Sequence, residues 1–215
     1  MRSLWPPVVL APLAALMLAG CGTATPVMST ADSQDDRSAT ESRSEGPAAF
    51  TRADAHAFSA FPLYWLGSSF DRLPLTAITR RNDAAIAGQD VRADYVGFVY
   101  GDCVATDETG CPPPLEVQVW PACQRALADY ALTPTGDPVP HRMTRVRGVP
   151  AASFEQGLRL ELYTGDVTVV IFGLVKQSVL RAAAALHAAN GLASDRATLP
   201  QPVRGAMRGH LRCAT

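Results

Sequence analysis

Cysteine is the residue type with the most distinctive chemistry in this chain of 215 residues, which contains five cysteines. Four of them lie from position 103 onward, separated by 7, 11 and 89 intervening residues: Cys103, Cys111, Cys123 and Cys213. These intervals match no paired spacing of zinc ligands. An even number of cysteines instead favours disulfide bonds.

We therefore expect two disulfides, although four cysteines allow three pairings. Cys103 follows one expected strand and Cys111 precedes the next, so a hairpin would place them within bridging distance. By elimination, Cys123 pairs with Cys213. If chain entropy governs their effect, the short loop contributes about 2.5 kcal/mol and the long loop about 4.5 kcal/mol to stability.

The acidic residues and histidines form no recognisable catalytic or metal-binding motif. Asp102, Asp107 and Glu108 could offer oxygen ligands to calcium, but their spacing is not that of a known calcium loop and equally suits a solvated loop. The four histidines fall in no nucleophile or metalloprotease signature. We expect no cofactor, no bound metal and no enzymatic activity; an enzyme with an unrecognised acid–base site is the alternative.

Aromatic side chains are the remaining candidates for a binding role. Tyr64, Trp65 and Trp120 could line a cleft for a sugar, peptide or lipid, because aromatic rings combine a large contact area with a polar group. The simpler interpretation, which we favour, is that these residues belong to the hydrophobic core. A ligand-binding role predicts that Trp65 or Trp120 is partly exposed in a concave site.

The N-terminal residues have the layout of an export signal. Arg2 precedes an apolar run from Leu4 to Leu18, which is too short and too rich in proline for a membrane-spanning helix. The run ends in Leu18-Ala19-Gly20-Cys21, which resembles the lipobox of bacterial lipoproteins. The resemblance implies removal of residues 1–20 and attachment of diacylglycerol to Cys21, which would anchor the protein to the outer face of the cell membrane. If Cys21 is an ordinary signal-peptide residue, the protein is secreted.

Composition divides the remaining chain into a tether and a single domain. Residues 21–46 contain few large apolar side chains, so they cannot offset the entropy of ordering and are expected to be a disordered tether. Residues 47–215 are of ordinary size for one globular domain. The net charge of −1 and scattered basic residues argue against nucleic acid as a partner.

Hydrophobic alternation and β-branched residues predict strands at 75–80, 94–100, 115–120, 145–154, 158–163 and 167–172. Helices are expected at 51–60, 123–132 and 178–189, with Thr51 and Ser178 as caps. The pattern predicts an α+β fold in which helices pack on one face of an antiparallel sheet of about six strands. Two halves, each of three strands and a helix, could form this sheet.

Several short segments strengthen the expected location at the cell envelope. They resemble recurring segments of predicted lipoproteins from GC-rich Gram-positive soil bacteria: Tyr64-Trp65-Leu66-Gly67, Leu73-Pro74-Leu75, Tyr100-Gly101-Asp102-Cys103 and Cys111-Pro112-Pro113-Pro114-Leu115. This resemblance implies no activity and supplies no site residue. We therefore expect a surface-tethered protein that binds a small ligand or contacts another envelope protein without catalysis. An interaction role predicts an exposed apolar patch.

Overall fold

The computed structural model describes residues 50–83, 93–102, 112–133 and 135–213, which belong to one compact unit. The lipobox, the whole of the expected tether, Cys103 and Cys111 lie outside these residues. The fold is α+β, as expected, and is dominated by one antiparallel sheet. None of the helices in the described ranges is long and apolar enough to span a membrane.

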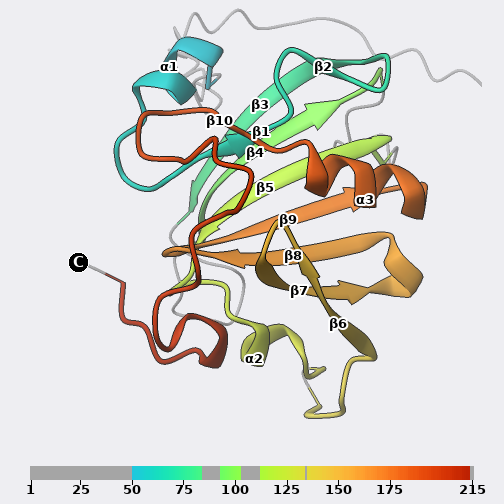
Figure 1. Ribbon diagram of the computed structural model, residues 1–215, viewed down its shortest axis with the longest axis vertical. Helices are drawn as coiled ribbons and strands as arrows, with labels where there is room; N and C mark the ends of the chain where they lie inside the picture. Colours follow the sequence, from blue (N-terminus) through green and yellow to red (C-terminus); the bar gives the residue numbers. More distant parts are fainter. Residues whose placement is uncertain (1–49, 84–92, 103–111, 134, 214–215) are drawn as a thin grey trace, which may run out of the picture. The chain divides into compact units, whose positions relative to one another are not determined.

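The main sheet has eight strands in the order β2-β3-β4-β5-β9-β8-β7-β6 (Figure 1). In chain order its strands are β2 (Ser69–Phe70), β3 (Leu73–Asp83), β4 (Ala93–Tyr100), β5 (Leu115–Pro121), β6 (His141–Val146), β7 (Val149–Phe154), β8 (Arg159–Thr164) and β9 (Val167–Gly173). The order describes two four-stranded meanders, β2–β5 and β6–β9, which meet where β5 pairs with β9.

The count of eight exceeds the expected six for two local reasons. The single strand expected at 145–154 is instead the hairpin of β6 and β7, because Arg147 and Gly148 both adopt positive φ and reverse the chain. The short strand β2 adds a further edge beside β3. β9 lies inside the sheet, since β5 and β8 pair with its two sides.

One face of the sheet carries the main hydrophobic core. Alternate residues of β4, β5, β8 and β9 point into it, and they pack against α1 (Arg52–Ala57), the segment 58–66 and α3 (Lys176–Ala184). α3 contacts β8 and β9 (Figure 1). The opposite face is covered in part by α2 (Leu127–Tyr130) and the 3-10 turn η2 (Ala206–Arg208), beside Phe154 and Tyr163.

Helix boundaries differ from the expected ones where tertiary contacts intervene. Thr51 caps α1 as predicted, because its hydroxyl accepts from the Asp54 amide at 3.2 Å. The helix expected at 123–132 is reduced to the four residues of α2. α3 begins after Val175, which makes no side-chain cap, rather than at Ser178.

α3 ends at Ala184, before the expected 189, because the following residues are bound elsewhere. His187 and Ala188 form β10, which pairs with β1 (Tyr64–Trp65). Asn190 then lies buried, and its side chain accepts from the Leu63 amide at 3.0 Å and donates to the carbonyls of Phe58 and Phe61. These bonds secure the segment before β1 against the core.

Candidate functional site

The aromatic residues considered for ligand binding do not gather at one place. Tyr64 is buried in the main core. Trp65 is half-buried on the same side of the sheet, 6.0 Å from the Phe98 ring and 5.3 Å from the His56 ring. Trp120 is buried on the opposite face, where it stacks on Tyr95 at 4.1 Å. The three side chains therefore do not line a common cleft.

Trp120 belongs to a polar row along one face of β5. Its indole N–H donates to Gln118 Oε1 at 3.0 Å, and Gln118 Nε2 donates to Glu116 Oε1 at 2.8 Å. Burial raises the pKa of the Glu116 carboxyl, because removal from water disfavours its charged form. These hydrogen bonds give partners to the buried indole N–H of Trp120 and to the Gln118 side-chain amide, next to the stacked rings of Trp120 and Tyr95.

A buried ionic cluster lies on the same face of the sheet as Trp120, against strand β8 of the second meander. The fully buried Glu161 accepts from Arg125 Nη2 at 2.6 Å and from the Tyr163 hydroxyl at 3.2 Å. The Arg125 guanidinium lies 3.9 Å from the Tyr130 ring centroid and 5.2 Å from that of Trp120. Burial raises the pKa of Tyr163, and the neighbouring carboxylate adds to the effect.

This cluster is internal and holds the segment after β5 against β8. Thr168 supplies a further bond by donating its hydroxyl to the Arg125 carbonyl at 2.6 Å. Sequence reasoning missed both members of the ion pair, Arg125 and Glu161. The available signal was Glu161 itself, which lies between Leu160 and Leu162 in an inner strand and so requires a buried partner.

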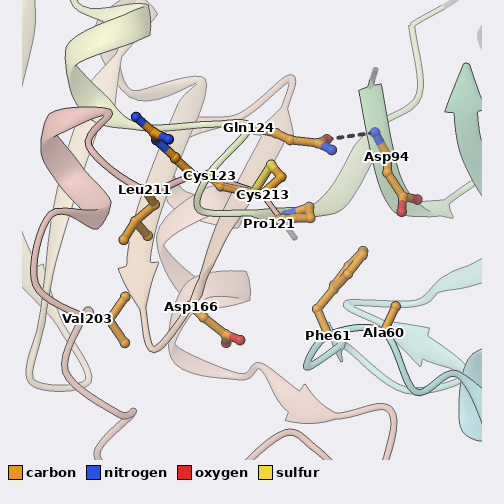
Figure 2. A pocket seen from close by; sticks show the side chains of 11 residues that line it. Ala60, Phe61, Asp94, Pro121, Cys123, Gln124, Asp166, Val203, Leu211 and Cys213 are labelled. Atoms are coloured by element: carbon orange, nitrogen blue, oxygen red, sulfur yellow. Dashed lines mark hydrogen bonds between the residues drawn. A yellow bond between two sulfur atoms is a disulfide. The ribbon is translucent and has the colours of Figure 1, made fainter. Parts of the chain in front are cut away.

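The predicted bridge between Cys123 and Cys213 is confirmed. Their Cα atoms lie 5.2 Å apart across a sequence separation of 90. The bridge fastens the C-terminal segment to the residues that follow β5 (Figure 2). Cys103 and Cys111, expected to form the second bridge, lie outside the described residues.

A cavity of about 470 Å³ lies beside this disulfide (Figure 2). Gln124 Oε1 accepts a hydrogen bond from the Asp94 amide at 2.7 Å across its wall, and the Asp94 carboxylate lies 3.5 Å from Arg80. Asp166 and Arg212 are the other charged residues of its lining. Two acids and one base on distinct segments do not define a ligand class, so we assign this cavity no binding role.

A second hollow, of about 570 Å³, lies at the other end of strands β4, β5 and β9. The turn between β2 and β3, the start of β5 and the link from β9 to α3 form its walls. Leu174 and Val175 are each 57% exposed here, although both are aliphatic. They form the largest exposed apolar pair of neighbours in the described part of the chain.

The polar side of this hollow comes from a strained turn. Asp71 and Arg72 have φ of 49° and 69°, a region that disfavours residues with a Cβ. Arg181 of α3 binds the Asp71 carboxylate through Nε at 3.0 Å and Nη2 at 2.6 Å. Arg72 has no hydrogen-bond or ion-pair partner among the residues that the structure describes. The hollow thus combines exposed aliphatic groups with an unpaired cation.

Within the described ranges, no three histidine, cysteine, aspartate or glutamate side chains gather closely enough to hold a metal ion. Of the acidic residues considered for calcium, Asp107 and Glu108 lie outside those ranges. No protein family, curated protein or solved structure matches this chain.

Proposed function

We propose that this protein is a lipid-anchored component of the bacterial cell envelope that acts by non-catalytic contact with another molecule. The residues Leu18-Ala19-Gly20-Cys21 support the anchor. A diacylglyceryl group supplies two acyl chains, which suffice for stable membrane attachment where one chain does not.

The anchor is tested by the variant Cys21→Ser in the full chain. We expect the parent protein to partition into detergent and the variant to appear in the culture medium. Equal partitioning of the two proteins would contradict lipidation at Cys21.

The hollow beside the turn between β2 and β3 is the proposed contact site, and the exposure of Leu174 and Val175 is the observation that carries the proposal. Complete burial of such a side chain stabilises a complex by about 1.5–3 kcal/mol. The pair is therefore a hydrophobic anchor for a partner, while Arg72 supplies a charged group at the rim.

A photoreactive residue in place of Leu174, in the full chain in its native envelope, tests this assignment. Leu132 is a matched control because it is an aliphatic residue of similar exposure, at 51%, that does not line the hollow. We expect a specific crosslinked product from position 174 that is absent from position 132. It should weaken when Arg72→Glu reverses the charge at the rim. Equal products from both positions would contradict the site.

A further inference from the structure

Strand β6 forms an outer edge of the main sheet and pairs only with β7 within the described residues. Its first five residues, from His141 to Arg145, are all exposed. Their pairing with β7 has no register shift, so the edge is regular throughout its length. Such an edge presents a row of backbone donors and acceptors that another strand can use.

The geometry of the hairpin specifies which backbone groups point outward. Arg147 and Gly148 form a two-residue turn, so the flanking pair Val146 and Val149 exchanges hydrogen bonds. Alternation along β6 then directs the backbone N–H and C=O groups of His141, Met143 and Arg145 away from β7. Pro150 fits this assignment because it lies opposite Arg145, where β7 needs no amide donor toward β6.

This edge is held firmly by its turn. The Arg147 guanidinium donates to the Leu186 carbonyl at 2.5 Å, to the Ala197 carbonyl at 3.2 Å and to the Arg196 carbonyl. Gly148 provides the positive φ without a Cβ, which would otherwise lie 2.6 Å from Thr198 Cγ2. An edge fixed in advance loses little entropy when a strand is added.

The opposite side of the sheet is less suited to strand addition. The long strand β3 has a register irregularity between Leu75 and Ala77, and such bulges disturb an edge. Arg80 in the same strand is committed to Asp94 and to the Phe58 ring. β6 has no register irregularity, and its Arg145 donates to the Gly148 carbonyl at 2.9 Å rather than to a carboxylate.

The charge of β6 specifies the partner. Arg142 and Arg145 are exposed, neither forms an ion pair within the described residues, and the strand contains no acidic residue. A second copy of β6 would bring like charges together, which disfavours self-pairing. We propose that β6 is a docking edge that accepts an extended acidic segment of another protein as a ninth strand. This interaction is separate from the proposed contact at the hollow.

Binding to the full chain is measured with two short synthetic peptides, one alternating glutamate with valine and the other alternating lysine with valine. We expect the glutamate peptide to bind at least ten times more tightly. The double variant Arg142→Glu/Arg145→Glu should reverse this preference. Equal affinity for the two peptides would overturn the acidic specificity.

The variant Met143→Pro removes an outward N–H and leaves the pairing with β7 in place, because proline is tolerated at the free side of an edge strand. We expect at least a tenfold loss of affinity for the glutamate peptide. Met143→Val, which retains the N–H, is the matched control and should bind like the parent protein. Unchanged binding by a folded Met143→Pro variant would overturn the proposal.

Amide hydrogen exchange on the parent protein gives a measurement that does not depend on folding of the proline variant. The glutamate peptide should protect the amides of His141, Met143 and Arg145, while those of Arg142 and Thr144 change little. Protection without this alternation would contradict strand addition. Self-association that Met143→Pro abolishes would instead identify a second copy as the occupant and overturn the proposed partner.

Discussion

The two outer hairpins of the sheet use the same turn geometry in different ways. β2–β3 and β6–β7 each reverse through two residues with positive φ, at 49° and 69° for Asp71 and Arg72 and at 48° and 82° for Arg147 and Gly148. In the second hairpin glycine relieves the strain and the arginine binds three carbonyls. The first hairpin retains two strained side chains at a hollow, and Arg72 has no partner there among the described residues.

A second difference concerns two glutamates on the same face of the sheet. Glu161 in β8 is fully buried and bound by Arg125. Glu116 in β5 receives its hydrogen bond from the neutral amide of Gln118, and burial raises its pKa. Glu161 of the meander β6–β9 is thus neutralised by Arg125 from the segment after β5, whereas the hydrogen-bond partner of Glu116 in β5 is a neutral amide. Among the described residues, the first meander has an unpaired arginine, Arg72, at its outer turn. The second meander has an unpaired strand edge at β6.

The largest expected effect comes from breaking the ion pair that joins Arg125, after β5, to Glu161 of β8. Arg125→Met leaves Glu161 buried with Arg159, 3.7 Å away, as its remaining ion-pair partner, and should lower the free energy of unfolding by about 3 kcal/mol. Denaturant unfolding measures this loss. Adding Glu161→Leu should recover most of it, since the buried charge is then removed. A double variant as unstable as Arg125→Met would contradict this account.

The two turn arginines provide the next and most direct comparison. Arg147→Ala removes donors from the carbonyls of Leu186, Arg196 and Ala197, and it should cost about 2 kcal/mol of unfolding free energy. Arg72→Ala, the control, should cost less than about 0.5 kcal/mol because its side chain is exposed and unpaired. Thermal unfolding of both variants tests the difference. Equal losses would show that the two turns are equivalent.

Glycine substitution at the first turn should have a smaller and opposite effect. Arg72→Gly relieves a positive φ and is expected to raise the free energy of unfolding by about 1 kcal/mol, while weakening partner contact at the hollow. The reciprocal change Gly148→Ala should destabilise the second turn, because the new Cβ meets Thr198. Denaturant midpoints of the two variants should therefore move in opposite directions. Movement in the same direction would refute the strain argument.

The smallest expected effect is a pH dependence at Glu116. Its pKa is raised in the folded protein, so between the ordinary value of 4.5 and the raised value the folded state binds more protons than the unfolded chain. Stability attributable to this group is consequently lost as the pH rises through that interval. Glu116→Gln should therefore be more stable than the parent at neutral pH, by less than about 1 kcal/mol. The difference should diminish below pH 4.5.

Unfolding measured across this pH range provides the check. A gain that is independent of pH would assign the effect to packing rather than to ionisation.

Local sequence patterns were sufficient to predict those elements that depend on residues close together in the chain. Alternation of apolar side chains predicted the inner strands β4, β5, β8 and β9, and the spacing of Thr51 and Asp54 predicted the cap of α1. The bridge between Cys123 and Cys213 followed from the expected hairpin and elimination. The proposed contact site could not be predicted from the sequence. Neither the exposure of Leu174 nor the lack of a partner for Arg72 among the described residues produces a periodic pattern.

The sequence by itself determined the α+β class, the inner strands and one disulfide, because each depends on which side chains are apolar or can be oxidised. Only the tertiary structure decided where β6 turns into β7, where α3 ends and which partner Glu161 receives. Those features depend on groups distant in the chain: Arg147 reaches the Leu186 carbonyl, and Arg125 reaches Glu161. Periodicity identifies the face on which a residue lies, but hydrogen-bond partners across the core are selected by packing.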